Sequence, residues 1–206
     1  MILMEYTYSK KTITLPNKEL TLLDRVALDF VSRIDVQYVI VSGYVAILFG
    51  RSRNTEDIDI FIKDDGLESF SKFYDKIVSD GKYWAINTID ASDAYDLMTT
   101  HKSSLRFAEK NTLDPNFEIK FANKETDYYS LENALTMDFG IAGKLKISPL
   151  EIEIAYKLFL GSEKDFADAK HIFITFKESL DMDKLKAFIR ELNISKDTAN
   201  NVLGYL

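Results

Sequence analysis

Acidic and aliphatic residues alternate along Asp57-Ile58-Asp59-Ile60. Successive side chains of a β-strand point to opposite faces, so this alternation predicts a strand whose isoleucines enter the core and whose two carboxylates share the other face. Magnesium prefers carboxylate and phosphate oxygens, and two acids on one face suit a shared metal. Such a triplet also arises by chance in acidic proteins, and taken alone it favours a solvated strand face.

The segment before this strand predicts a phosphate-binding turn. The run 38–41 (Tyr-Val-Ile-Val) is typical of a strand buried on both faces, and Ser42-Gly43 ends it. A short helix follows to Phe49, and Gly43 stands at its start, fourteen residues before Asp57. Unpaired N–H groups at a helix N-terminus favour an anion, Gly lets a phosphate approach the backbone, and Ser42 adds a donor. A plain strand-to-helix turn is the alternative for an isolated Gly43.

Arg51, Arg53 and Thr55 lie between this turn and the acidic strand. The planar guanidinium matches phosphate oxygens, so an arginine here would hold a triphosphate while the carboxylates hold its metals. Surface charge is the alternative explanation, and it fits Arg51 better than Arg53.

The rest of the chain divides into a mixed first part and a helical second part. Residues 1–16 indicate an extended arm or edge strand, and the spacing of apolar residues predicts helices over 17–34 and 67–78 and strands over 83–89, 104–108 and 116–122. After Thr126 helical spacing dominates, over 150–160, 164–176, 183–192 and 197–206. We therefore expect a core over 1–126 and a mainly helical region over 127–206 packed on it.

Composition limits the chemistry. The 206 residues are 46% hydrophobic and include no cysteine and two histidines, which excludes disulfides and thiolate zinc sites and leaves oxygen ligands for any metal. His101 and His171 belong to no motif and are expected to be ordinary histidines. The start resembles no signal peptide, and the longest apolar run, 38–50, is short of the ~20 residues of a membrane span, so we expect a cytoplasmic protein with no membrane contact.

Three short motifs together resemble the signature of the nucleotidyltransferase superfamily. They are Val41-Ser42-Gly43-Tyr44, the following Ala46-Ile47-Leu48-Phe49-Gly50, and Arg53-x-Thr55-x-Asp57-Ile58-Asp59. The chain looks most like the minimal branch that includes the nucleotidyltransferase toxins of abortive-infection systems and related uncharacterised bacterial and archaeal proteins. Those proteins commonly have Gly-Gly where this chain has Ser42-Gly43.

The resemblance implies a third metal-binding acid on a neighbouring strand, and Glu118 in Phe117-Glu118-Ile119-Lys120-Phe121 matches it, with Asp114 as a less favoured substitute. Alternation would place Glu118 and Lys120 on one face, so a solvent-facing pair is the alternative. Mg²⁺ or Mn²⁺ would then be bound by Asp57, Asp59 and Glu118.

The toxin-like branch also has a helical Lys followed by a Lys/Arg-Asp-x-x-Asp segment, matched here by Lys157 and by Lys164-Asp165-Phe166-Ala167-Asp168. By this resemblance Lys157 is a catalytic candidate, and Asp165 joins Ser42, Gly43, Arg53 and Thr55 as a nucleotide-binding candidate. Lys157 snorkelling from an amphipathic helix, and Asp165 starting a helix together with Ser162, are the alternatives.

The implied fold is α/β (α+β): a small, twisted mixed sheet flanked by helices, with a helical C-terminal region that walls the cleft. The implied reaction moves a nucleoside monophosphate from a nucleoside triphosphate to a hydroxyl acceptor, in a possible toxin–antitoxin setting. The sequence leaves open whether the acceptor is tRNA, a protein or a small molecule, and it does not indicate the oligomeric state. Two other classes stay open, a non-catalytic nucleotide-binding or antitoxin-like module and a kinase-like or hydrolytic activity.

Nucleic acid binding depends on many contacts from Lys and Arg to phosphate, and the net charge of −7 disfavours long nucleic acids. A tRNA end would need a local basic patch. Lys144, Lys146, Lys157 and Lys164 would supply one if they project to one side.

Overall fold

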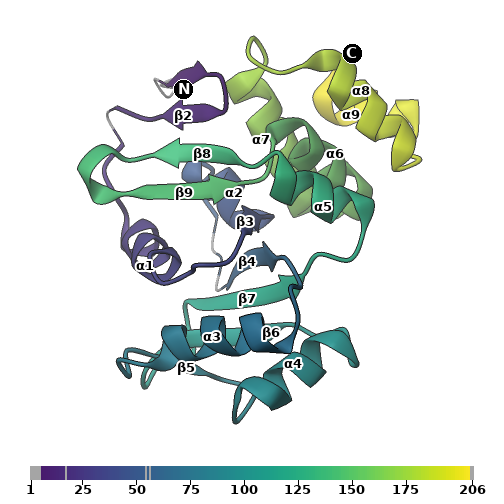
Figure 1. Ribbon diagram of the computed structural model, residues 1–206. Coiled ribbons are helices and arrows are strands. Elements are labelled where there is room, and N and C mark those ends of the chain that lie inside the picture. The colour runs from purple at the N-terminus through teal and green to yellow at the C-terminus, as the bar shows by residue number, and fades with distance from the viewer. Residues whose placement is uncertain (1–5, 17, 54, 56, 205–206) are drawn as a thin grey trace.

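The computed structural model describes residues 6–16, 18–53, 55 and 57–204. Some expected features lie outside the described residues. They are residues 1–5 of the arm expected over 1–16, the helix start expected at Asn17 and the last two residues of the expected final helix. Within the described ranges the strands form one nine-stranded mixed sheet in the order β1-β2-β8-β9-β3-β4-β7-β6-β5 (Figure 1). The strands are β1 (Thr7–Ser9), β2 (Thr12–Thr14), β3 (Tyr38–Val41), β4 (Asp57–Ile62), β5 (Tyr83–Ala85), β6 (Leu105–Glu109), β7 (Asn116–Phe121), β8 (Leu135–Asp138) and β9 (Lys144–Ile147). The α/β class is confirmed, and the sheet is larger than expected.

The helices cover the sheet in two groups. In Figure 1, α3 and α4 lie beside the β7-β6-β5 end, whereas the yellow-green C-terminal helices gather at the other end, near β1 and β2. The helices are α1 (Leu22–Val31), α2 (Gly43–Leu48), α3 (Leu67–Val78), α4 (Ala91–Thr99), α5 (Glu125–Glu132), α6 (Leu150–Leu160), α7 (Glu163–Phe176), α8 (Met182–Glu191) and α9 (Lys196–Leu203), with a 3₁₀ turn at Gly140–Ala142. None of the described helices is long and apolar enough to cross a membrane.

The register of the central strands brings the acidic residues together. β3 and β4 are antiparallel, with Val41 opposite Asp59, and β4 and β7 are parallel, with Asp57 beside Asn116 and Asp59 beside Glu118. Neighbouring residues in register share a face of the sheet. Glu118 therefore lies on the same face as both aspartates, on the strand next to theirs.

The opposite face of these strands forms the main core. Ile58, Ile60 and Ile62 are at most 1% exposed, as the alternation predicts. The ring of Phe30 from α1 stacks on that of Phe117 from β7, with centroids 3.7 Å apart and planes 6° apart. Aromatic rings bury a large apolar area, so this stack fixes α1 against the centre of the sheet.

Asp24 links the first two helices. It completes a capping box at the start of α1, where its backbone N–H donates to Thr21 Oγ1 at 3.1 Å and its carboxylate accepts from the Thr21 N–H at 2.9 Å. The carboxylate also accepts from the Tyr44 hydroxyl at 2.8 Å and pairs with Lys18 at 3.0 Å. Since Tyr44 lies in α2, this buried acid positions the helix that follows the Ser42-Gly43 turn.

Several expectations about secondary structure were wrong. The region after Thr126, expected to be mainly helical, also holds two strands that were not expected, because β8 and β9 form a hairpin that pairs with β2 on one side and β3 on the other. The strand expected over 83–89 ends at Ala85, and α4 follows where no helix was expected. Strands of four residues carry little periodic signal, and their pairing depends on partners about 100 residues away in the chain.

Candidate functional site

The turn between β3 and α2 holds Ser42 in a positive-φ conformation, with φ at 67° and ψ at −139°. Non-glycine residues rarely adopt positive φ, and such strain is often found at functional sites. α2 has only six residues, so its dipole is small, and phosphate binding at this turn would depend mainly on side chains. The turn directs the Ser42 hydroxyl toward α6.

Gly43 is required by the close approach of Arg53. A Cβ at this position would lie 2.9 Å from Nη2 of Arg53 and 3.1 Å from its Cζ. The Arg53 guanidinium in turn forms a hydrogen-bonded ion pair with Asp168 of α7. Arg51 Nε lies 3.5 Å from the other oxygen of the same carboxylate. Both arginines thus lie beside the Asp168 carboxylate of α7, and Arg53 also packs against the turn.

Lys157 of α6 joins the same group of charges. Its side chain is 2% exposed, and its ammonium lies 3.2 Å from Ser42 Oγ, 2.9 Å from Asp165 and 3.6 Å from Asp168. We call Arg53, Lys157, Asp165 and Asp168 the ion cluster. The structure thus brings the helical Lys and both acids of the Lys-Asp-x-x-Asp segment to the Ser42 turn.

Asp165 has a second role. Burial disfavours its ionised form, but hydrogen bonds from Ser162 and Lys157 and the Lys157 charge outweigh burial and lower its pKa below the ordinary value. Its backbone N–H donates to Ser162 Oγ at the start of α7. The two interpretations of this residue, helix start and site residue, are therefore compatible.

The carboxylates of β4 lie at the other side of the turn. Thr55 Oγ1 donates to the Asp57 carboxylate at 3.1 Å and to its backbone carbonyl at 3.0 Å. The Asp59 carboxylate accepts from the Lys120 ammonium at 2.9 Å. Thr55 therefore orients the first acid, and Lys120 neutralises the second.

Glu118 is held by three donors. It pairs with Arg106, lies 3.1 Å from the Lys120 ammonium and accepts from Ser104 Oγ at 3.2 Å. Burial would raise the pKa of Glu118, but Lys120 and Arg106 more than compensate and lower it. Lys120 thus contacts Asp59 as well as Glu118, so these two residues form a partly buried bridge and not the solvent-facing pair that was the alternative.

The side chains fit a divalent metal only in part. Asp57 and Asp59 offer the hard oxygen donors that magnesium prefers. Yet among the described residues no group of three or more His, Asp or Glu side chains is arranged to hold a metal ion. Glu118 lies beside Asp59 on the neighbouring strand and on the same face, and the Lys120 ammonium contacts both carboxylates.

A cavity of about 310 Å³ opens beside the central strands, and Ser42, Asp59 and Lys120 are among the residues that line it. Phe61 and Tyr156 are aromatic residues in its lining, and Lys102, Lys120 and Lys124 are its cations. This volume is within the range of small-molecule sites. The cations favour an anionic ligand, and the rings offer apolar surfaces for a base.

Sequence reasoning missed Glu153, one helical turn before Lys157. Glu153 is 3% exposed, and its Oε1 has no hydrogen-bond partner among the described residues. Burial raises the pKa of this carboxyl to about 7, against the opposing effects of Lys157 and a hydrogen bond from the Ser42 backbone. An acid within the apolar run Leu150–Leu160 was the available signal, because a buried carboxylate needs a partner.

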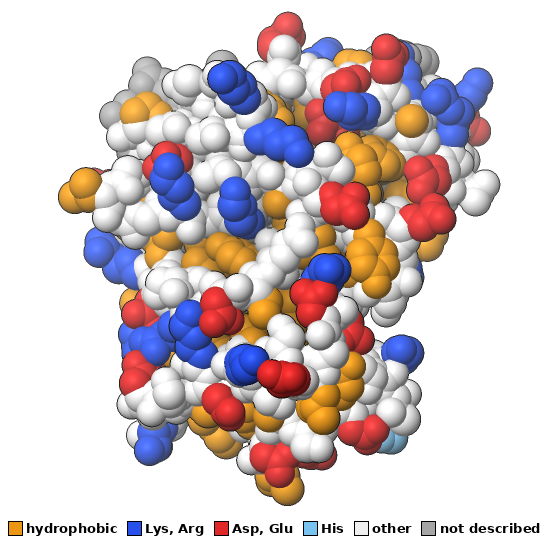
Figure 2. All heavy atoms as spheres, in the orientation of Figure 1, with side chains coloured by type: hydrophobic (Ala, Val, Ile, Leu, Met, Phe, Trp, Pro, Cys, Tyr) orange, Lys and Arg blue, Asp and Glu red, His pale blue; other side chains and the backbone are white. Residues whose placement is uncertain are grey.

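Other candidates lie elsewhere. Asp114 is exposed before β7, and its carboxylate accepts from the Asn116 side chain at 3.4 Å. His101 is exposed, and His171 lies 2.8 Å from the Phe49 carbonyl. Lys144, Lys146 and Lys164 are exposed, whereas Lys157 is buried and is therefore not available for the expected RNA-binding patch. Figure 2 shows Lys and Arg side chains over the β8–β9 end of the sheet, and acidic and basic side chains interspersed elsewhere on this face.

The chain was compared with known proteins. No protein-family model matches it, and no curated protein matches its sequence. Among solved structures it is similar to an antigenic nucleotidyltransferase-like protein from Paracoccidioides brasiliensis, with a TM-score of 0.51 and 14% identity over 87% of this chain and 89% of that chain. At this identity the likeness is one of fold. The chain therefore has a mixed α/β fold of the nucleotidyltransferase-like kind.

Proposed function

We propose that this protein is a metal-dependent nucleotidyltransferase that moves a nucleoside monophosphate from a nucleoside triphosphate to a hydroxyl acceptor. The observation that carries the proposal is the position of Ser42. Its hydroxyl contacts Lys157 of the ion cluster, and the same residue lines the cavity with Asp59. Ser42 therefore links the ion cluster to a cavity that Asp59 and the cation Lys120 also line, which supports a phosphoryl-type transfer at this place.

In the proposed reaction the acceptor oxygen forms a bond to the α-phosphorus while the bond from that phosphorus to the bridging oxygen breaks, and pyrophosphate leaves. Ser42 and Lys157 would contact the outer phosphates, with Asp165 holding the Lys157 ammonium in place. The Arg53 guanidinium, which lies against Gly43, would also contact these phosphates. Preorganised donors of this kind stabilise charge that develops in the transition state.

Asp57 and Asp59 would hold the divalent cation, and Glu118 would be its third ligand after Lys120 moves away. When bound, a Mg²⁺ or Mn²⁺ ion supplies charge neutralisation at the transferred phosphoryl group. Lys120 in turn would be free to contact a phosphate in the cavity. Exchange of the Lys120 ammonium for the metal ion would keep the negative charges of Asp59 and Glu118 compensated both without and with the metal.

We also propose that the chain is related to the toxin-like branch. Lys157 with Asp165 and Asp168 supports a relationship to that branch, since these residues meet at the Ser42 turn. A tRNA acceptor would rely on the exposed Lys144, Lys146 and Lys164 alone. Reversing these three charges should then weaken RNA binding and reduce its dependence on salt. Unchanged RNA binding would exclude this docking surface.

The test is calorimetric titration of the protein with each nucleoside triphosphate and magnesium. An Asp57→Asn, Asp59→Asn double variant is titrated in parallel, and Asp114→Asn provides a control for loss of an exposed acid near β7. Magnesium-dependent binding that is lost only in the double variant supports the proposal. Labelled nucleotide then identifies the acceptor in a cell extract, by the molecule that becomes covalently labelled.

A non-catalytic nucleotide-binding or antitoxin-like module is the second candidate. It is favoured by one observation, the Lys120 ammonium between Asp59 and Glu118, which compensates these carboxylates without a metal. That module would bind a nucleotide equally with and without magnesium, or not at all. The same titrations therefore separate it from the transferase.

A further inference from the structure

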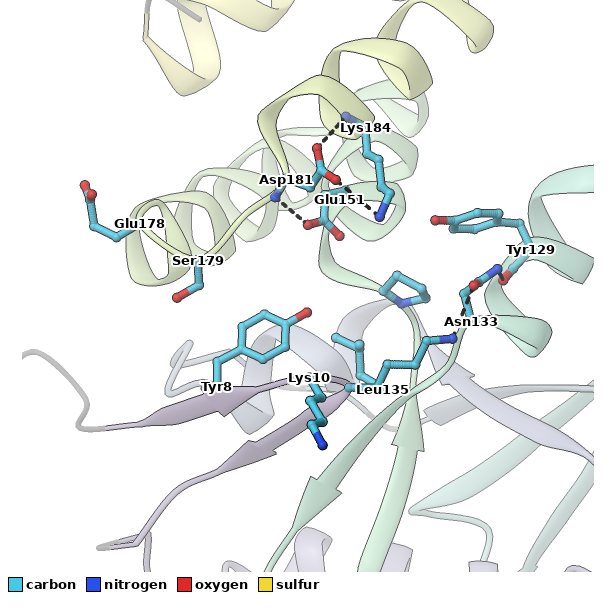
Figure 3. A pocket seen from close by; sticks show the side chains of 12 residues that line it. Tyr8, Lys10, Tyr129, Asn133, Leu135, Glu151, Glu178, Ser179, Asp181 and Lys184 are labelled. Atoms are coloured by element: carbon cyan, nitrogen blue, oxygen red, sulfur yellow. Dashed lines mark hydrogen bonds and ion pairs between the residues drawn. The ribbon is translucent and has the colours of Figure 1, made fainter.

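A second hollow, of about 450 Å³, lies between the β1–β2 hairpin, α5, the start of α6 and the segment joining α7 to α8 (Figure 3). Its lining shares no residue with the cavity beside Asp59. Tyr6 holds the hairpin in place, with its hydroxyl 3.1 Å from Ser179 Oγ and its ring centroid 4.5 Å from that of Phe176. Four segments distant in sequence thus build this second hollow.

Polar groups point into the hollow from different elements. Figure 3 shows the hydroxyls of Tyr8 and Tyr129, the ammonium of Lys184 and one carboxylate oxygen of Glu151 directed toward its interior. In the part of the chain that the structure describes, neither tyrosine hydroxyl has a hydrogen-bond partner. Burial, the Glu151 charge and Tyr129 raise the pKa of Tyr8 to about 12, so its hydroxyl stays neutral. Convergent polar groups in a hollow are typical of a ligand site.

Glu151 is a buried acid for which the described residues provide no ion-pair partner. It is 7% exposed, and one of its oxygens accepts from the Asp181 backbone N–H at 2.8 Å. Among the described residues no Lys, Arg or His forms an ion pair with Glu151, because Lys184 pairs instead with the Asp181 carboxylate at 3.2 Å. A buried carboxylate without a cation is unfavourable, and an ammonium group on a ligand would compensate it.

Lysines also belong to the lining, and one of them, Lys184, lies beside Asp181 and Glu151 (Figure 3). Lys11 lines the hollow as well, and its Nζ lies 3.3 Å from the Asn133 side-chain carbonyl. Lys184 is half-exposed, so its ammonium keeps donors for an additional acceptor. Leu135 and Pro149 supply apolar surface in the same lining. A ligand that satisfies these groups carries an ammonium and a carboxylate close together, with an apolar part beside them.

We propose that this hollow binds a free α-amino acid, with its ammonium on Glu151, its carboxylate on Lys184, and its side chain against the rings of Tyr8 and Tyr129. A free α-amino acid carries an ammonium and a carboxylate on the same carbon. It is also small enough for the hollow, which leaves room for a large side chain. The site is independent of the proposed transferase function, because it shares no residue with that site.

The experiment is isothermal calorimetry of the full chain against single free amino acids, chosen from each side-chain class. Two matched analogues of the best ligand follow: its N-acetyl derivative, which lacks the ammonium, and its amide, which lacks the carboxylate. We expect measurable binding of at least one free amino acid and about tenfold or more weaker binding of both analogues, since each loses a charged hydrogen bond.

Two variants test the residues. Glu151→Gln removes the charge but keeps an acceptor for the Asp181 N–H, and Lys184→Gln removes the cation. We expect each to weaken binding about tenfold or more, whereas the exposed controls Glu163→Gln and Arg190→Gln leave it unchanged. Circular dichroism verifies that all four remain folded. The proposal is overturned if no amino acid binds the folded protein, if either analogue binds as well as the amino acid, or if Glu151→Gln has no effect.

Discussion

The ammonium of Lys157 lies 3.2 Å from the hydroxyl of Ser42, although 115 residues separate them in the chain. The contact joins α6 to the turn between β3 and α2. Asp165 and Asp168 both compensate this ammonium, whose side chain is 2% exposed. This link makes the helical region part of the candidate site and not only a cover for it.

Loss of the Lys157 charge should destabilise the fold. Lys157→Met leaves Asp165 and Asp168 without this cation in a buried position, and removing one partner of a buried ion pair costs about 3–5 kcal/mol. The free energy of unfolding from urea titration measures the loss. Lys164→Met is the matched control, because Lys164 is exposed on α7, and it should change stability by less than about 0.5 kcal/mol. Equal stability of the two variants would contradict a structural role for the ion cluster.

Gly43→Ala should be unfavourable although alanine is the better helix former. Its Cβ would lie 2.9 Å from Nη2 of Arg53, so the guanidinium must move from its place beside Asp168. We expect a loss of about 1–3 kcal/mol, as for other overpacked sites. In an Arg53→Ala background the same change should cost less, because the clashing group is gone. A double-mutant cycle of unfolding free energies measures this coupling, and strict additivity would argue against the contact.

Removal of the Lys120 charge should strengthen metal binding. Its ammonium lies 2.9 Å from Asp59 and 3.1 Å from Glu118, where it competes with a divalent cation for both carboxylates. We expect Lys120→Gln to bind Mn²⁺ about tenfold or more tightly than the unaltered protein in calorimetric titration. Lys102→Gln, at another part of the same cavity, is the control. Weaker Mn²⁺ binding by Lys120→Gln would mean that the lysine supports the metal site instead of competing with it.

The stability of the fold should depend on pH through Glu153. Burial raises the pKa of this carboxyl from 4.5 to about 7, so between these values the folded protein binds more protons than the unfolded chain. The stabilisation that the protonated Glu153 carboxyl contributes is fully present below its pKa in the unfolded chain. It is lost as pH rises through its pKa in the folded protein, by a total on the order of 3 kcal/mol.

The check compares the free energy of unfolding of the unaltered protein and of Glu153→Gln at about pH 5 and about pH 8. The difference between the two proteins should change with pH in favour of the variant at the higher value, since glutamine cannot ionise. Glu163→Gln, at an exposed position, should show no such change. An identical pH dependence of Glu153→Gln and the unaltered protein would mean that this carboxyl does not titrate in the expected range.

Local sequence pattern was sufficient for the elements whose periodicity is strong. The helices over Leu67–Val78 and Leu150–Leu160 begin and end where their spacing predicts, and β4 buries its isoleucines as the alternation requires. The pattern also identified the Ser42-Gly43 turn as the end of a strand and the start of a helix. Each of these features depends on side chains within a few residues of one another, which is the range over which helical and strand periodicity operates.

The contacts between site residues could not be predicted in this way, because the residues that meet are far apart in the sequence. The sequence placed Glu118 and Lys120 on one face, but only the strand register brought both to Asp59, and only the fold of β6 added Arg106. The hairpin of β8 and β9 was missed for a similar reason, since four-residue strands are stabilised by their neighbours in the sheet.

The sequence by itself determined which segments are strands and helices in most of the chain, and which residues are chemically suited to phosphate and metal. The tertiary structure alone decided that Lys157 meets Ser42, that Lys120 bridges Asp59 and Glu118, and that Glu153 is buried beside them. The physical reason is that ion pairing and burial depend on distances through space, and packing of the whole chain sets those distances.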